Sequence, residues 1–286
     1  MWLWWILASS VVLSLYDIGK KASVRGNAVF PVLFGTTLSG WLAVSAFLLA
    51  RGELAAAAAL PARQAGLLLI KSCIVGASWT ATYMALRTLP ITLAAPIRAT
   101  GPMWTLLGAV FIFSERPTAL QNVGIFLTLA GCIAFSLLGR RDESSAPLMR
   151  RAIALAFAGT LFGSCSALYD KCLLQSMGMP PGTVLWWFMG GMCVIYAAIT
   201  AVVGRGGFEW RITMPCVGVL LAISDACYFN AVAVPDAKIS VLSLIRRSSV
   251  VLTFLLGGAM FHETDLRRRA IALAAIVAGV ALLCLA

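Results

Sequence analysis

The sequence predicts an all-α polytopic membrane protein with ten transmembrane helices, arranged as two inverted five-helix repeats. Three observations carry this prediction. Of the 286 residues, 61% are hydrophobic and 12% are charged, with a mean hydropathy of +0.94, whereas soluble domains carry roughly 25% charged residues. Apolar runs long enough to cross about 30 Å of hydrocarbon recur ten times. The two halves of the chain also resemble each other in sequence.

The apolar runs lack strand alternation and are about twice as long as the strands of a membrane barrel, so we expect helices. The expected spans lie near residues 2–17, 30–50, 66–86, 93–113, 118–138, 152–173, 183–203, 214–234, 239–261 and 268–286. The connections between them are short, which leaves no room for a soluble domain. The first span opens with MWLWWIL and has its lysines after it, so we expect a retained span and not a cleaved signal.

The net charge of +11 does not indicate nucleic-acid binding, because much of the basic charge lies in short loops between spans. Lysine and arginine are more frequent after odd-numbered spans, which taken alone places both termini outside. The eight cysteines all fall within apolar spans and show no CxxC spacing. We therefore expect neither a disulfide framework nor a metal site, and no cofactor.

The internal repeat divides the chain into residues 1–138, a linker at 139–151, and residues 152–286. IRATGPMWTLLGAVF begins at residue 97 and IRRSSVVLTFLLGGA begins at residue 245. This offset of 148 residues aligns Arg98 with Arg246, Glu115 with Glu263, and Gly131 with Gly279. Because each half holds an odd number of spans, the second half must enter the membrane from the opposite side. Such inverted repeats are typical of secondary transporters that alternate access to a site near the midplane.

The duplicated segments resemble those of the EamA-type members of the drug/metabolite transporter superfamily. The resemblance rests on two copies of a span, an acidic turn (Ser114-Glu115-Arg116 and His262-Glu263-Thr264) and a glycine-containing span, and it covers almost the whole chain. It implies a ten-helix carrier of small organic metabolites that uses no ATP and lies in the inner (plasma) membrane of a bacterium. A proline common in the fourth helix of such proteins matches Pro102, whereas the ninth helix has Val250. Members usually have both termini in the cytoplasm, against the charge distribution, so the orientation stays open.

Arginines deep within two apolar spans are the main candidates for substrate binding. Arg98 lies about five residues from the centre of the fourth span, and Arg246, beside Arg247, lies about three from the centre of the ninth. A charged residue at the centre of a membrane helix costs about 2.5 to 3.5 kcal/mol on insertion scales and is functional by default. Because Arg98 and Arg246 are repeat equivalents, we expect both to face a shared interior and grip a phosphate or carboxylate. Related phosphate and nucleotide-sugar transporters carry similar basic residues, and that resemblance also favours an anion.

Asp225, in the middle of the eighth span, has two alternative roles. It can pair with an arginine, either permanently or until an anionic substrate replaces it. It can also act as the group that takes up a proton during transport, because a carboxyl in a low dielectric has a raised pKa. The residues do not separate these roles.

Asp17 and Asp170 recur in matching LYD triplets near the ends of the first and sixth spans. We expect hydrated ion pairs with the neighbouring lysines there, with a gating role as the alternative. Lys71 lies five residues into the third span, and we expect it to reach the interface.

Three aromatic residues complete the candidate site. Tyr83 and Tyr228 match across the repeat, each a few residues before a proline, and a polar cavity would supply a partner for each hydroxyl. Core packing is the equal alternative for both. Trp104 follows Arg98 by six residues and is a candidate for the cavity wall.

The function we expect is secondary transport of a small anionic metabolite, with proton or exchange coupling. The alternative within the same class is an exporter of amino acids or other zwitterionic metabolites. A membrane enzyme is the competitor from another class, but the chain has a single histidine and lacks HExxH, paired-carboxylate and P-loop motifs. The expected partners are the substrate and membrane lipid, with no nucleic acid, for a monomer or homodimer.

Overall fold

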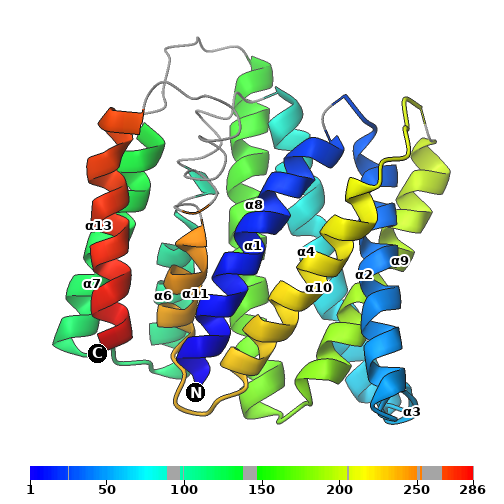
Figure 1. Ribbon diagram of the computed structural model, residues 1–286, viewed down its shortest axis with the longest axis horizontal. Helices are drawn as coiled ribbons and strands as arrows, with labels where there is room; N and C mark the ends of the chain where they lie inside the picture. The colour runs from blue at the N-terminus through cyan, green and yellow to red at the C-terminus, as the bar shows by residue number, and fades with distance from the viewer. Residues whose placement is uncertain are drawn as a thin grey trace. The chain divides into compact units, whose positions relative to one another are not determined.

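The computed structural model describes residues 1–24, 26–88, 97–98, 100–137, 147–204, 206–249, 252 and 266–285 (Figure 1). Pro90, Val250, His262 and Glu263, which entered the sequence argument, lie outside these ranges. Within the described ranges every regular element is a helix, as the absence of strand alternation predicts. The helices are α1 (Trp2–Val24), α2 (Val29–Ala50), α3 (Leu54–Ala58), α4 (Ala62–Thr88), α6 (Gly101–Phe113), α7 (Ala119–Leu137), α8 (Pro147–Lys171), the π-helix η1 (Cys172–Ser176), α9 (Pro181–Val203), α10 (Thr213–Val232), α11 (Ile239–Arg247) and α13 (Leu266–Leu285).

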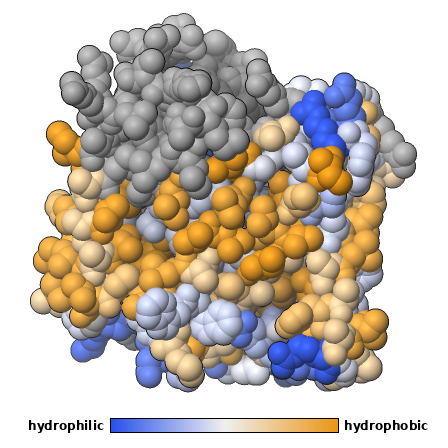
Figure 2. Space-filling model, viewed as in Figure 1, coloured by the Kyte–Doolittle hydropathy of each residue, from blue (hydrophilic) through white to orange (hydrophobic). Residues whose placement is uncertain are grey.

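Six helices of the described part are long and apolar enough to cross a membrane by length and composition. They run over Trp2–Lys20, Val29–Ala50, Ala62–Ala85, Arg150–Ser176, Pro181–Val203 and Thr213–Val232, which confirms the first, second, third, sixth, seventh and eighth expected spans as helices. Shorter apolar helices lie within the fourth, fifth and tenth expected spans. In Figure 2 apolar side chains cover the visible flanks of the helices and hydrophilic ones gather near helix ends, the pattern of a lipid-facing surface.

The described helices form two compact units, and each unit draws on both halves of the sequence. Unit 1 comprises Met1–Gly76 and Asp170–Pro235, and unit 2 comprises Ala77–Tyr169 and Asp236–Ala286. Helices α4 and α8 therefore begin in one unit and end in the other. The compact units are thus different from the sequence repeats, which remain a prediction about symmetry.

Unit 1 is built by close helix contacts at small residues. Helix α10 packs against α1 and α2, and α2 also packs against α9. Ser9 Oγ donates to Ser224 O at 2.8 Å, and Ser224 Oγ donates to Ser9 O at 3.0 Å, so α1 and α10 are bonded in both directions. A Cβ added at Gly40 would lie 2.9 Å from Gly218 O, which shows how closely α2 and α10 approach. Small residues that admit such approach are typical of packed membrane helices.

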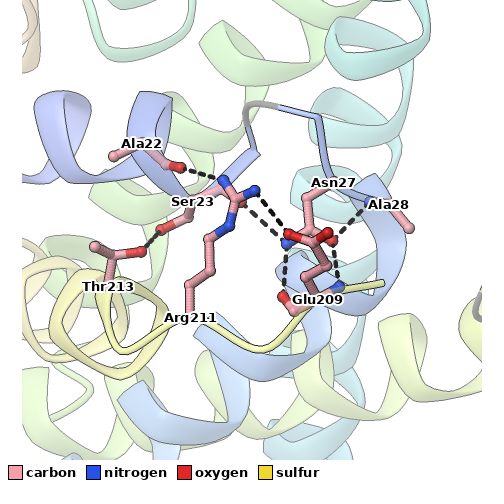
Figure 3. A network of polar contacts seen from close by, with 7 residues as sticks. All are labelled: Ala22, Ser23, Asn27, Ala28, Glu209, Arg211 and Thr213. Atoms are coloured by element: carbon pink, nitrogen blue, oxygen red, sulfur yellow. Dashed lines mark hydrogen bonds and ion pairs between the residues drawn. The ribbon is translucent and has the colours of Figure 1, made fainter. Parts of the chain in front are cut away.

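A polar network joins the α1–α2 turn to the segment before α10 at one end of unit 1 (Figure 3). Asn27 Nδ2 donates to Glu209 O at 2.7 Å, and Asn27 Oδ1 accepts from Glu209 N at 3.0 Å. Arg211 donates to Ala22 O at 2.9 Å and to Glu209 Oε2 at 3.1 Å. These bonds align the two turns. Because Glu209 is exposed, they contribute only a small amount to stability.

Unit 2 pairs α6 with α11 and α7 with α13, which lie side by side in Figure 1. A Cβ added at Gly131 would lie 2.9 Å from Ala272 O and from Ile276 N. One added at Gly279 would lie 2.9 Å from Gly124 O and 2.7 Å from Thr128 N. Both glycines are therefore required where the backbones of α7 and α13 approach. The same unit holds the bond from Ser78 Oγ to Gly159 O, at 2.6 Å, between α4 and α8.

Candidate functional site

The three candidate arginines all belong to unit 2 and are half-buried. Arg98 lies in a short helical stretch, residues 97–98, that precedes α6. Its neighbour Ile97 packs against a core of alanines from α4 and α8, which anchors this stretch (Ala85, Ala152 and Ala156). Arg246 and Arg247 occupy the last turn of α11.

Arg247 lies against the first residue of α6. Its Nη2 atom is 3.2 Å from the position that a Cβ on Gly101 would take, so the guanidinium lies close to the backbone there. Gly101 follows Arg98 by three residues, about one helical turn. Arg247, and not the repeat equivalent Arg246, is the arginine whose position beside the start of α6 is defined by a contact.

The start of α6 is held by hydroxyl groups. Thr100 Oγ1 donates to Ile97 O at 2.7 Å and accepts from Trp104 Nε1 at 3.2 Å, so the half-buried indole is fixed in orientation. Ser164 Oγ, on α8, donates to Gly101 O at 2.9 Å. The N-terminus of a helix carries partial positive charge and unsatisfied N–H groups, which favours anions. A guanidinium beside that terminus forms a local cationic surface.

The carboxylates described in unit 2 are Glu115 and Asp236. Glu115 is buried and accepts hydrogen bonds from the N-terminus of α11, the end opposite the arginines. Asp236 is exposed. Basic charge therefore exceeds acidic charge around the start of α6 in the described part of this unit.

The remaining candidates are placed as follows. Tyr83 is buried on α4 in unit 2. Tyr228 is buried on α10 in unit 1, with its ring 5.6 Å from that of Phe229. Asp225 is also buried on α10, and Asp17 is half-buried on α1. Asp17, Asp225 and Tyr228 thus share unit 1, whereas Tyr83 shares unit 2 with the arginines.

The expectations for Lys71 and Asp170 are wrong. Lys71 is 2% exposed and Asp170 is 3% exposed, and the two form a short, buried ion pair. Helix α4 begins at Ala62, so Lys71 lies well inside it and not near the interface. Helix α8 continues past Asp170 into η1, so Asp170 does not lie at a helix end either. Its partner is Lys71 of α4, in place of the adjacent Lys171.

Two aromatic rings enclose this ion pair. Lys71 Nζ lies 4.7 Å from the centroid of the Phe188 ring and 5.0 Å from that of Phe229. The two rings meet edge to face, with centroids 6.3 Å apart. The negative faces of aromatic rings attract a cation, more strongly when water is absent. The carboxylate and the rings together therefore compensate the desolvation of the ammonium group.

Sequence reasoning missed this pair and the role of Glu115. One signal was available: Lys71 and Asp170 each stand inside an apolar stretch, and a buried lysine needs a carboxylate. The adjacent Lys171 obscured it, because a neighbour in sequence offered a simpler partner. The sequence contains an acidic turn in both halves, but this recurrence alone assigns no role to Glu115.

Residues 1–137 match the model of the EamA-like transporter family. A solved crystal structure, described only as that of a protein, has a TM-score of 0.79 over 98% of this chain and 96% of its own length. Its identity is 18%, so it shows the fold alone. The search of curated proteins found no match. The family match and the six apolar helices establish a multi-pass membrane protein. The resemblance inferred from the sequence is confirmed over residues 1–137, which match the EamA-like transporter family.

Proposed function

We propose that this protein is a secondary transporter that moves a small organic metabolite by alternating access. The phosphate or carboxylate group of that metabolite is held by the arginines of unit 2, Arg98, Arg246 and Arg247. The family supplies the transporter class. The anionic substrate is argued from the site.

The observation that carries the proposal is the approach of the Arg247 guanidinium to Gly101 at the start of α6. The partial positive charge at a helix N-terminus favours negative charge, and a guanidinium presents N–H donors that suit phosphate or carboxylate oxygens. Arg98 adds a second guanidinium one turn before Gly101. A guanidinium near the positive end of a helix is unfavourable in an apolar setting, and a bound anion relieves that cost.

Contacts between α7 and α13 support the inverted repeat. Gly131 packs against Ala272 and Ile276, and its repeat equivalent Gly279 packs against Gly124 and Thr128. The same offset of 148 residues relates Gly124 to Ala272 and Thr128 to Ile276. Contacts that exchange in this way are what a two-fold axis between repeats requires. Alternating access is the mechanism such repeats usually serve.

The acidic residues of unit 1 have proposed roles in coupling. Asp225 is the proposed proton-coupling group or counter-ion, since it is a buried carboxylate on a membrane helix. Asp17 is the proposed gating residue, whereas Asp170, paired with the buried Lys71, is assigned to structural support. An Asp225→Asn carrier should still exchange labelled for unlabelled substrate but lose uptake driven by a pH gradient, if Asp225 carries the proton. Loss of exchange as well would assign Asp225 to substrate binding.

Counterflow in reconstituted vesicles tests the function. Vesicles preloaded with one solute should take up the labelled form of that solute in a saturable manner, and the solutes offered should include phosphate esters, carboxylates and amino acids. Counterflow of phosphate esters or carboxylates that is lost in folded Arg246→Gln supports the proposal. Unchanged transport by Arg246→Gln contradicts the substrate-binding role. Counterflow of amino acids alone favours the zwitterion exporter, and product formation without gradient dependence indicates an enzyme.

A further inference from the structure

Glu115 lies in the turn after α6, and the backbone directs it inward. Ser114, the C-cap of α6, adopts the left-handed conformation with φ 53°, which a non-glycine residue rarely adopts. The turn is closed by the bond from Glu115 N to Ala109 O, at 3.2 Å. Glu115 is 7% exposed, so its carboxylate is buried within unit 2. A buried carboxylate is costly unless its oxygens accept hydrogen bonds.

Those hydrogen bonds come from the N-terminus of α11. Glu115 Oε1 accepts from Ile239 N at 2.8 Å, and Oε2 accepts from Ser240 N at 3.3 Å and from Ser240 Oγ at 2.5 Å. Lys238, at the N-cap position of α11, makes no side-chain capping bond to its own helix. Glu115 therefore caps α11 from a different part of the chain, and its charge complements the helix dipole.

Lys238 strengthens the same junction from the other direction. Its Nζ donates to Arg116 O at 2.9 Å and to Gln121 Oε1 at 2.8 Å. The residue that precedes α11 is therefore bonded to the turn that carries Glu115 and to the start of α7. The N-terminal end of α11 is fixed in position by bonds in both directions.

The opposite end of α11 carries Arg246 and Arg247, and Arg247 lies against Gly101 at the start of α6. Helices α6 and α11 are therefore antiparallel and contact each other at both ends. Helix α11 has only nine residues, a length at which an isolated helix is not stable. A shift of one residue along such a helix turns every side chain by about 100°. Its N-terminal attachment thus determines where its guanidinium groups point.

We propose that Glu115 is a positioning residue for the anion site: its carboxylate fixes the register of α11 and thereby holds Arg246 and Arg247 at the start of α6. This inference rests on the proposed function, because it assigns the arginines to anion binding. Glu115 lies at the other end of α11 and does not itself contact the anion.

The test compares Glu115→Gln, Ser240→Ala and the control Glu53→Gln with the wild-type carrier. Glu53 is an exposed carboxylate that pairs with Arg51 in unit 1, so its loss removes the same charge elsewhere. The dissociation constant of inorganic phosphate is measured from the rise in unfolding temperature with phosphate concentration. Loss of a helix cap of this kind should weaken phosphate binding by about tenfold in Glu115→Gln and about twofold in Ser240→Ala. Glu53→Gln should bind as the wild type does.

A merely structural role would lower the unfolding temperature without phosphate and leave the dissociation constant of the folded protein unchanged. That result in Glu115→Gln overturns the proposal while the proposed function stands, provided Arg247→Gln weakens phosphate binding. If Glu115→Gln does not fold, the Ser240→Ala variant tests the proposal instead. Phosphate binding by Ser240→Ala equal to that of the wild type overturns the proposal.

If the wild-type protein does not bind phosphate, the phosphate group is excluded from the proposed function, and hydrogen exchange reads the position of α11 directly. Faster exchange in Glu115→Gln at the amides of both Ile239 and Arg247 supports control of the whole helix by Glu115. Faster exchange at Ile239 alone contradicts it.

Discussion

The two units treat buried charge differently. In unit 1, Lys71 and Asp170 form an ion pair in which both side chains are almost fully buried, and the Lys71 ammonium group lies beside two phenylalanine rings. In unit 2, the half-buried Arg247 lies against the start of α6, while the buried carboxylate Glu115 is bonded to the far end of α11. The first arrangement is complete without a ligand. The second has an excess of positive charge in its described part.

The difference shows how a carrier can separate support from substrate binding. A buried pair is weak evidence for net stability, but removal of one partner leaves an uncompensated charge and is costly. A guanidinium beside a helix N-terminus gains most when an anion arrives. We therefore expect substitutions in the pair to change folding first, and substitutions at the arginines to change binding first.

The largest effect should come from breaking the pair. Lys71→Met leaves the buried Asp170 carboxylate without its ammonium partner and should cost about 3 to 5 kcal/mol of stability. Thermal unfolding in detergent measures this loss. The double variant Lys71→Met/Asp170→Asn carries no buried charge and should recover more than half of it. Equal stability of the single and double variants would show that the pair is not coupled.

The next largest effect should fall on ligand binding. Arg247→Gln removes charged hydrogen bonds worth about 1.5 to 3 kcal/mol, so phosphate should bind roughly 10- to 100-fold more weakly. The unfolding temperature without phosphate should change little, because Arg247 is half-buried. Lys171→Gln, which removes a half-buried cation in unit 1, is the matched control. A similar loss of binding in that control would make the effect one of net charge.

Six of the expected spans could be predicted because each depends on composition alone. The run 183–203 corresponds to Pro181–Val203, and 214–234 corresponds to Thr213–Val232. The repeat pairs Arg98 with Arg246 and did not predict the approach of Arg247 to Gly101. Partner choice could not be predicted, since Asp170 bonds to Lys71, 99 positions away, in place of the adjacent Lys171. The cap on α11 likewise joins residues 124 positions apart, which no local pattern reveals.

A third test concerns the framework of unit 2, independent of its charges. Gly131→Ala and Gly279→Ala each place a Cβ within 3.0 Å of backbone atoms of the facing helix. Each should destabilise the protein by about 1 to 3 kcal/mol, because backbone yields less readily than a side chain. Similar losses in unfolding temperature would fit their equivalence in the repeat. A large loss in one variant and none in the other would count against the two-fold relation of α7 and α13.

The smallest expected effect is a gain. Ser114→Gly removes a side chain from a left-handed position and should stabilise the turn by about 0.5 to 1 kcal/mol. Chemical denaturation measures the gain, and Ser114→Ala, which keeps the Cβ, should show none. Phosphate binding should be unchanged in Ser114→Gly, because Glu115 keeps its place at the N-terminus of α11. A fall in stability would mean that the Ser114 side chain itself supports the turn.

The most direct measurement is saturable phosphate-ester or carboxylate counterflow by vesicles that contain either of two folded variants. We predict that Arg246→Gln/Arg247→Gln abolishes counterflow, whereas Lys71→Met/Asp170→Asn retains it with altered stability. Counterflow that persists without the two arginines and disappears without the buried pair would reverse the roles assigned to the two units.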